Sequence, residues 1–236
     1  MKKKHVLSLF VIFIIMLFNV TYAADSEVSK KIISIVYDDS GSMMSGNNYC
    51  YSDYALQILT ATLEKNDELN IVKMSEYYQN NEIDLSTQTQ KQNYIDEIRN
   101  FSHNGGTPFE SVNTARDWLI NQSKKNGDSA DYWLVVITDG AFAGLPSPLN
   151  AYFDDINSEF NNLNYEFVLL SIGGYTDFEL KNVVTTTANS NLITANDKEG
   201  VYDSMLKIAN MINNGASDKI VTAEKNGDKK IKAYSK

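Results

Sequence analysis

The stretch Ile32-Ile33-Ser34-Ile35-Val36-Tyr37-Asp38-Asp39-Ser40-Gly41-Ser42-Met43 joins an apolar run to a cluster of oxygen-bearing side chains. Residues 32–37 are rich in β-branched side chains and show no strict alternation, which is typical of a strand buried on both faces. The carboxylates and hydroxyls that follow cannot stay buried without partners, because an unpaired carboxylate in a dry core is strongly unfavourable. We therefore predict that the strand delivers residues 38–42 to a surface, where their oxygens meet a hard cation such as Mg²⁺.

Strands and amphipathic helices alternate along the chain, and three of the strands are continuously apolar. Buried parallel strands have this composition, and the intervening helices supply the crossovers that parallel strands need. The pattern predicts an α/β fold with a doubly wound, mainly parallel sheet and helices on both faces. The expected strands are 31–37, 69–74, 82–85, 132–137, 167–172 and 191–194; the expected helices are 53–65 and 90–101, with others beginning at Pro108, after Ser147-Pro148, at Asp177 and after Asp197.

Two of the apolar strands end in polar residues. The first ends at Asp38, Ser40 and Ser42, and the strand 132–137 ends at Thr138-Asp139-Gly140. In open α/β sheets, ligands bind outside the carboxyl ends of the strands, at the point where the strand order reverses. We therefore expect both polar ends to lie at one edge of the sheet, although Asp139-Gly140 alone is also an ordinary turn signal.

The N-terminus has the pattern of a secretory signal. Three lysines precede an apolar run over residues 6–18, and Thr21-Tyr22-Ala23 supplies small residues around a cleavage point after Ala23. The run is short for a membrane span, so we expect residues 1–23 to be removed and the protein to be secreted or displayed at the cell surface. An uncleaved membrane anchor is the alternative.

The rest of the chain is divided by composition and charge. Residues 24–30 form a linker, 31–213 the domain, and 214–236 a tail in which Asn226-Gly227-Asp228 predicts a β-hairpin that either packs on the domain or begins a further module. Removal of residues 1–23 takes away three lysines and no acids, which leaves 18 basic and 30 acidic residues and a net charge of −12. This balance argues against a nucleic-acid partner, whose phosphates require a basic surface.

Nitrogen and sulfur ligands are scarce. Cys50 is the single cysteine and His103 the single histidine after the signal segment. They cannot form an intrachain disulfide or the usual zinc sets of three or four ligands. A Ser–His–Asp triad would depend on His103, which we expect to be a solvated residue of a polar loop. No dedicated general base or paired acid stands out beside residues 38–42, so the sequence does not favour an enzyme.

A third loop completes a recognisable pattern. Asp38, Ser40 and Ser42 form Asp-x-Ser-x-Ser at the end of the first strand, Thr107 lies in the loop Gly105-Gly106-Thr107-Pro108 before a helix, and Asp139 ends a later strand. The sequence over residues 31–213 resembles a von Willebrand factor type A domain with a metal-ion-dependent adhesion site. The resemblance implies that Ser40, Ser42 and Thr107 offer hydroxyls and that Asp38 and Asp139 bind the ion directly or through water.

The same resemblance sets the expected function. It implies a Rossmann-like sheet with one short antiparallel edge strand, a bound Mg²⁺ or Mn²⁺, and a protein ligand that supplies a carboxylate to an open coordination position. The mature chain would have no membrane span and no enzymatic activity. Two alternatives stay open: a scaffold or regulatory module of a cell-envelope complex with a structural metal, and, less favoured, a metal-dependent hydrolase.

Several neighbouring residues also have ordinary structural explanations. Thr107 could cap the following helix, since Thr107-Pro108-Phe109-Glu110 fits a capping box. Asp39 is expected to point away from the ion or to cap a backbone amide. Tyr49, Tyr51 and Tyr54 could form a contact rim beside the metal, but such tyrosines more often pack half-buried.

Overall fold

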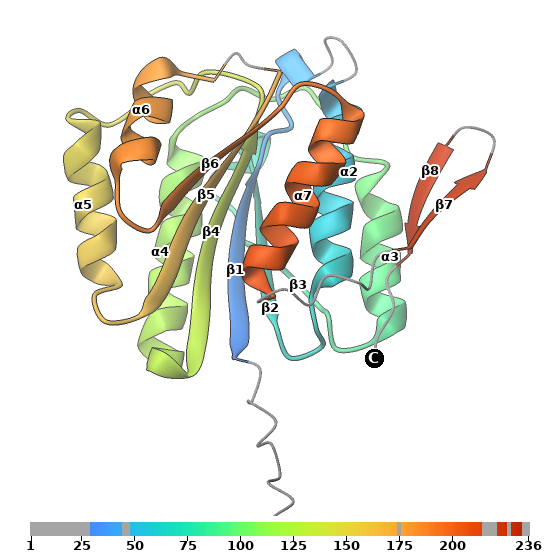
Figure 1. The fold of residues 1–236 in the computed structure, drawn as a ribbon, viewed down its shortest axis with the longest axis horizontal. Helices are drawn as coiled ribbons and strands as arrows, with labels where there is room; N and C mark the ends of the chain where they lie inside the picture. Colours follow the sequence, from blue (N-terminus) through green and yellow to red (C-terminus); the bar gives the residue numbers. More distant parts are fainter. Residues whose placement is uncertain (1–28, 44–47, 174–175, 214–220, 226–227, 233–236) are drawn as a thin grey trace, which may run out of the picture.

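A six-stranded sheet lies at the centre of the protein, in the strand order β3-β2-β1-β4-β5-β6 (Figure 1). This computed structural model describes residues 29–43, 48–173, 176–213, 221–225 and 228–232. Parallel pairing joins all neighbours except β3, which runs antiparallel to β2 at the edge. The strands are β1 (Lys30–Tyr37), β2 (Glu68–Lys73), β3 (Asn81–Ile83), β4 (Ala130–Thr138), β5 (Asn164–Ile172) and β6 (Ser190–Ala195).

Helices cover both faces of this sheet and form three layers with it (Figure 1). One face packs against α2 (Asn48–Thr62), α3 (Gln88–Ile98) and α7 (Lys198–Ile212); the other packs against α4 (Glu110–Asn126), α5 (Leu149–Glu159) and α6 (Phe178–Thr186). Short 3₁₀ turns follow β2 and α4: η2 (Met74–Glu76) and η3 (Gly127–Ser129). The predicted fold class, including the antiparallel edge strand, is confirmed.

Strand β1 shows why its sequence lacks alternation. Ile33, Ile35 and Tyr37 belong to the apolar core under α2, α3 and α7, whereas Ile32 and Val36 belong to the core on the opposite face. Successive side chains of a strand point to opposite faces, so a strand with helices on both sides must be apolar throughout. All five side chains are fully buried.

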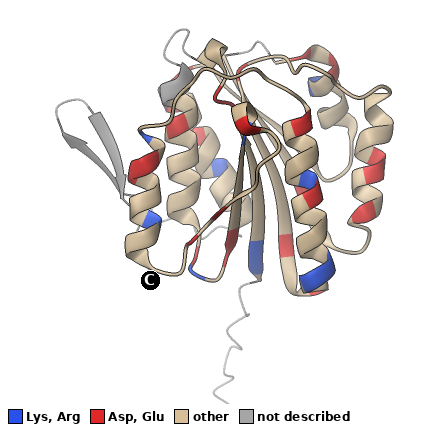
Figure 2. Ribbon diagram, turned by 180° about the vertical axis from the view of Figure 1, so that it is seen from behind, with Lys and Arg blue, Asp and Glu red and all other residues tan. Residues whose placement is uncertain are grey.

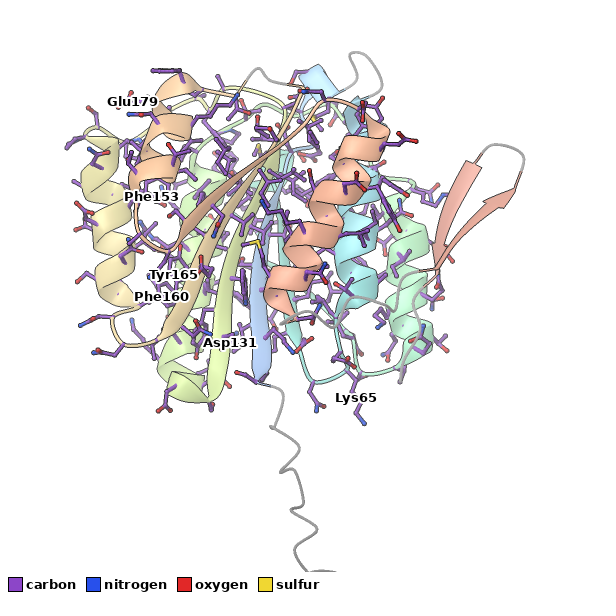
Figure 3. The ribbon with its side chains drawn as sticks, in the orientation of Figure 1. Lys65, Asp131, Phe153, Phe160, Tyr165 and Glu179 are labelled. Carbon is purple, nitrogen blue, oxygen red and sulfur yellow. The ribbon has the colours of Figure 1, made fainter. Side chains whose placement is uncertain are left out.

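Aromatic side chains fill the layer between the sheet and α5. The rings of Phe153 and Phe167 meet edge to face with centroids 5.0 Å apart, and those of Phe160 and Tyr165 stack at 4.3 Å (Figure 3). Acidic residues lie on the outer helices on both sides of the sheet (Figure 2). The domain therefore combines a dry core with a negatively charged exterior.

Three predicted helix starts were wrong, and three were right; among the wrong ones, α3 begins at Gln88 rather than residue 90. Helix α2 begins at Asn48 rather than residue 53; in the added N-terminal segment, Tyr51 packs against the same core as the leucine stripe. Helix α4 begins at Glu110 rather than Pro108. Helix α5 begins directly after Ser147-Pro148, as predicted; Pro148 occupies its N-cap position after a cis peptide bond, and no side-chain hydrogen bond caps the helix. The predicted caps Asp177 and Asp197 are confirmed, since each accepts hydrogen bonds from the first turn of its helix.

The ends of the chain are described only in part. Strands β7 (Val221–Lys225) and β8 (Asp228–Lys232) form the predicted antiparallel hairpin; its turn, residues 226–227, lies outside the described residues. The predicted signal peptide 1–23 also lies outside them. No helix among the described residues is long and apolar enough to cross a membrane.

Candidate functional site

The first group of polar residues, Asp38, Ser40 and Ser42, begins directly after β1. The Asp38 backbone N–H continues the sheet ladder to the carbonyl of Ile137 at 3.1 Å, but the Asp38 side chain is fully buried. Oδ1 accepts a hydrogen bond from the Ser40 N–H at 2.9 Å, and Oδ2 accepts one from the Thr138 hydroxyl at 2.6 Å. Burial raises the pKa of Asp38, while these two donors oppose the rise because they stabilise the charged form.

A chain of hydrogen bonds links the polar residues after β1 to Asp139 after β4. The Ser42 hydroxyl donates to Asp139 Oδ1 at 3.0 Å, and the Ser40 and Ser42 hydroxyl oxygens lie 2.8 Å apart. Since the single proton of Ser42 points to the carboxylate, Ser40 must donate to Ser42. The tertiary structure therefore gathers Asp38, Ser40, Ser42 and Asp139 at one edge of the sheet, at the carboxyl ends of β1 and β4.

Thr107 lies in the third loop beside this cluster, but its hydroxyl points elsewhere. Thr107 Oγ1 donates to the carbonyl of Ala141 at 2.7 Å. The capping alternative is wrong, because α4 begins at Glu110 with Phe109 in the N-cap position and no side chain bonds to that cap. A backbone contact draws the Thr107 loop towards Asp139, since the Ala143 N–H donates to the Thr107 carbonyl at 2.8 Å.

Backbone hydrogen bonds also join the first loop to the Thr107 loop. The Gly41 N–H donates to the Gly105 carbonyl at 3.1 Å, and the Gly105 N–H donates to the Asp39 carbonyl at 3.2 Å. The Asp39 carboxylate turns away from the cluster and accepts from the backbone N–H of Ser75 at 2.8 Å and from the Ser75 hydroxyl. The expected amide-capping role of Asp39 is thus confirmed.

The structure corrects the expectation for His103. Its side chain is 4% exposed, and Nε2 lies 2.9 Å from the Tyr37 hydroxyl and 3.2 Å from Asp53 Oδ1. The polar, glycine-rich composition of its loop predicted that His103 is exposed to solvent. The loop instead folds over the end of β1 and over α2. Sequence reasoning missed this cluster because Asp53 and Tyr37 come from elements whose packing only the fold determines.

The tyrosines after the first motif serve packing where they are described. Tyr54 is 4% exposed and stacks on Tyr202 with ring centroids 6.2 Å apart, and Tyr51 packs half-buried against the same core. The side chains of Tyr49 and Cys50 lie outside the described residues. The predicted contact rim is therefore not formed by Tyr51 and Tyr54.

The largest aromatic surfaces lie elsewhere. Among the described residues, the exposed large hydrophobic side chains are Tyr77, Tyr78 and Phe178, which are 40%, 68% and 84% exposed. Tyr77 and Tyr78 follow the carboxyl end of β2, and Phe178 opens the helix that follows β5. The sequence analysis did not single out these three residues. Their positions shortly after two parallel strands could have placed them at the carboxyl edge of the sheet.

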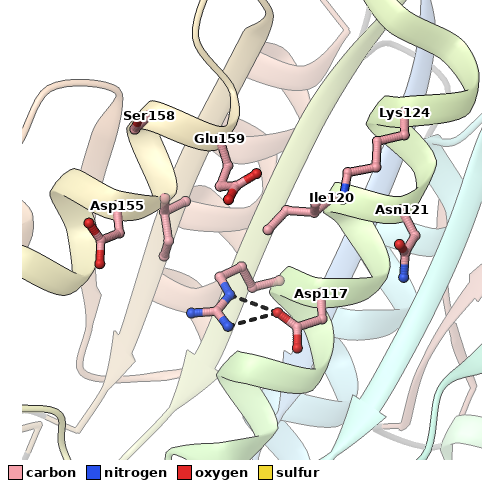
Figure 4. Close-up of a pocket in the computed structure, with 9 residues that line it drawn as sticks. Asp117, Ile120, Asn121, Lys124, Asp155, Ser158 and Glu159 are labelled. Atoms are coloured by element: carbon pink, nitrogen blue, oxygen red, sulfur yellow. Dashed lines mark hydrogen bonds and ion pairs between the residues drawn. The ribbon is translucent and has the colours of Figure 1, made fainter.

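One hollow of about 570 Å³ lies away from this edge, between α4 and α5 (Figure 4). Its lining is charged, and Arg116 pairs with Asp117 at 2.7 Å while its guanidinium lies over the Tyr152 ring. None of the five predicted metal ligands lines it. The hollow therefore adds nothing to the oxygen cluster.

The donor set of the cluster fits a hard divalent cation. Together with Thr107 it offers two carboxylates and three hydroxyls, and no group of three or more His, Cys, Asp or Glu side chains placed to hold a metal ion occurs among the residues that the structure describes. Mg²⁺ and Mn²⁺ accept such oxygens and keep several waters, whereas zinc sites use nitrogen and sulfur. The candidate site thus offers only oxygen ligands.

The sequence model of the von Willebrand factor type A domain matches residues 33–206. The chain belongs to this family. The match to the von Willebrand factor type A (VWA) domain begins within β1 and ends within α7, so it includes β2–β6 and α2–α6 completely and β1 and α7 in part.

Solved structures share the VWA fold at low sequence identity. A von Willebrand factor type A protein from Catenulispora acidiphila has a TM-score of 0.59 and 17% identity over 83% of this chain and 44% of its own. The pilus adhesin SpaC from Lactobacillus rhamnosus GG has a TM-score of 0.60 and 12% identity over 87% and 37%. Manganese-loaded TRAP protein from Plasmodium vivax has a TM-score of 0.52 and 14% identity over 77% and 73%.

This chain therefore spans less than half the length of the first two of these proteins. No curated protein matches it. At these identities the likeness shows the fold alone.

Proposed function

We propose that this VWA domain binds Mg²⁺ or Mn²⁺ through a metal-ion-dependent adhesion site and holds a protein partner through the ion. The observation that carries the proposal is the hydrogen-bonded chain from Ser40 through Ser42 to Asp139, which joins oxygen donors from two loops beside Asp38. The proposed ligands are Asp38, Ser40, Ser42, Thr107 and Asp139.

The chemistry of these residues suits holding rather than cutting. Two carboxylates neutralise the formal charge of the ion, and neutral hydroxyls fill further positions without adding charge. A bound ion would supply a Lewis-acidic position for a carboxylate of the partner. The Thr107 hydroxyl would have to give up its hydrogen bond to the Ala141 carbonyl to become a ligand of the ion. TRAP from Plasmodium vivax, which shares the fold, was solved loaded with manganese.

Exposed aromatic side chains flank the proposed site and support a protein partner. The site lies between the neighbouring strands β1 and β4, and the next strands outward are β2 and β5. Tyr77 and Tyr78 follow β2 on one side, and Phe178 follows β5 on the other. Neighbouring strands lie about 4.8 Å apart, so these rings are within reach of one protein surface. Aromatic residues commonly anchor such interfaces.

Acidic side chains lie at the same edge. Glu179 follows Phe178 at the start of α6 and is seen near the upper end of the domain in Figure 3, opposite Lys65 and Asp131. The partner surface would combine one carboxylate for the ion with apolar contacts for the exposed aromatic rings.

We further propose that residues 1–23 direct export and that residues 31–213 form the working domain at the cell surface or outside the cell. The pilus adhesin SpaC, a protein with the same fold, supports this placement.

Metal binding and partner capture test the proposal in two steps. Mn²⁺ titration followed by electron paramagnetic resonance should show one bound ion, which Asp38→Ala removes and Asp67→Ala keeps. Asp67 is a matched control, because it is a buried aspartate that accepts from the Lys31 N–H at the start of β1, far along the strand from Asp38.

A pull-down from the native surroundings then separates the alternatives. A partner that is lost with chelator and with Asp38→Ala supports the metal-bridged function. A partner that survives both treatments would contradict it and favour the scaffold, in which the metal is structural. Hydrolytic turnover that dies with Asp38→Ala would instead revive the metal-dependent hydrolase.

A further inference from the structure

Tyr37, Asp53 and His103 form a buried hydrogen-bonded cluster next to the proposed metal site. The Tyr37 hydroxyl donates to Asp53 Oδ1, and His103 Nε2 lies 2.9 Å from the Tyr37 oxygen and 3.2 Å from the same carboxylate oxygen. Tyr37 has one proton and gives it to the carboxylate, so the hydrogen between Tyr37 and His103 must come from Nε2. The single Nε2–H of His103 is therefore shared between the Tyr37 and Asp53 oxygens.

The three residues come from the segments that carry the metal ligands. Tyr37 directly precedes Asp38, Asp53 lies on α2, the first helix after Ser42, and His103 lies four residues before Thr107. The cluster thus ties both ends of the first ligand loop to the loop that carries Thr107.

A second attachment joins the same two loops on the backbone. The bridge between Ser40 and Gly105 rests on the Gly41 N–H to Gly105 carbonyl and Gly105 N–H to Asp39 carbonyl bonds. This ladder ends two residues before Thr107. On its C-terminal side the loop is held to residues 141–143 through Thr107, and on its N-terminal side the His103 side chain, which is 4% exposed, attaches it to Tyr37 and Asp53.

The burial of Asp53 explains why this attachment is strong. Its side chain is 11% exposed, and a carboxylate withdrawn from water needs donors. Burial raises the pKa of Asp53, and the hydrogen bonds and charge from Tyr37 and His103 oppose that rise. Loss of His103 would leave Asp53 with one donor fewer in a dry environment, which favours rearrangement of the loop.

We propose that His103 is a positioning residue for the metal site: it holds the Thr107 loop against the Ser40–Ser42 loop without touching the ion. This inference rests on the proposed function, because it concerns the same site. Groups that orient ligands from outside the coordination sphere typically change metal affinity by about 10–100-fold. We expect His103→Ala to weaken Mn²⁺ binding by at least about tenfold.

Mn²⁺ alone is the probe, titrated into each variant and followed by electron paramagnetic resonance. His103→Gln keeps an amide donor near the Nε2 position and should bind within about threefold of the wild type, whereas His103→Ala should not. Asp67→Ala is the control for general destabilisation, because Asp67 is also buried and bonded to two backbone N–H groups, those of Lys31 and Glu64. It should lower the melting temperature and leave Mn²⁺ affinity unchanged.

Amide hydrogen exchange in the metal-free protein measures how firmly His103 holds the Thr107 loop, independently of any ion. Amides of residues 102–107 should exchange faster in His103→Ala than in the wild type, and His103→Gln should restore protection. Equal exchange in all three proteins would overturn the inference, as would unchanged Mn²⁺ affinity in His103→Ala. Wild-type protein that binds no Mn²⁺ would overturn the proposed function and this inference together, whereas a normal wild type beside an unaffected His103→Ala overturns this inference alone.

Discussion

The Ser42 hydroxyl donates a hydrogen bond to Asp139 Oδ1 at 3.0 Å, although 97 residues separate the two along the chain. The contact exists because β1 and β4 are adjacent parallel strands, with Tyr37 opposite Ile137 at their carboxyl ends. The donor atoms of the proposed site are therefore gathered by the fold itself.

Ser42→Ala should separate metal binding from folding. It removes a hydroxyl ligand, so we expect Mn²⁺ affinity to fall by at least about tenfold. Ser42 is exposed and makes two hydrogen bonds, each of which contributes about 1 kcal/mol net, so the unfolding free energy of the metal-free protein should fall by no more than about 2 kcal/mol. Titration and denaturant unfolding measure the two quantities.

Ser86→Ala is the matched control for that change. Ser86 is an exposed serine whose hydroxyl donates to Gln90 Oε1 at 3.0 Å, outside the site. Its removal should leave Mn²⁺ affinity intact. Equal affinity in Ser42→Ala and Ser86→Ala would exclude Ser42 from the ligand set.

Gly105→Ala and Gly106→Ala should behave differently despite being neighbours. A Cβ at Gly105 would lie 2.7 Å from the Cβ and 2.9 Å from the Cα of Ser75, whereas a Cβ at Gly106 meets nothing within 4 Å. The Gly105 variant must displace backbone and should lose about 1–3 kcal/mol of stability. The Gly106 variant should be neutral or gain up to about 1 kcal/mol, since alanine narrows the unfolded ensemble. Thermal unfolding of both variants checks this, and equal melting temperatures would contradict the close contact with Ser75.

Tyr78→Ser and Phe178→Ser should weaken partner binding without changing metal binding. Both side chains are more than half exposed, so their loss removes interface contacts rather than core packing. Truncation of an aromatic anchor typically costs about 2 kcal/mol or more of binding energy. Retention of the captured partner in a metal-supplemented pull-down is the measurement, and Lys65→Ala at the opposite edge is the control. Full retention by both aromatic variants would place the interface elsewhere.

Stability should depend on pH through Asp67. Burial raises the pKa of Asp67 above its ordinary value of 3.8, although Lys31 and its backbone N–H partly oppose the rise. The folded state then binds the proton more tightly than the unfolded chain, so this group costs stability as the pH rises through 3.8 towards the raised pKa.

The comparison with Asp67→Asn isolates that effect. The variant does not titrate at this position, so the stability of the wild type relative to Asp67→Asn should be greatest at acidic pH and smaller at neutral pH. Denaturant unfolding of both proteins across this range measures the difference. A difference that grows with pH would reverse the assigned direction.

Sequence patterns predicted the sheet well because its signal is local. The unbroken apolar composition of β1, β4 and β5 follows directly from burial on both faces, and the helices between them require parallel crossovers. Helix starts were less predictable: α2 begins five residues early, and Tyr51 in the added segment packs against the core. Packing of that kind cannot be read from a leucine stripe alone.

The sequence by itself determined the VWA fold and pointed to the five proposed ligands Asp38, Ser40, Ser42, Thr107 and Asp139, because strand composition and the Asp-x-Ser-x-Ser spacing are properties of short segments. Only the tertiary structure decided how the donors are linked, where Thr107 points, and that His103 is buried against Asp53 and Tyr37. These relations depend on which strands become neighbours and on which loops fold over them. Contacts between residues 50 or 100 positions apart leave no periodic trace in the chain, so the fold alone reveals them.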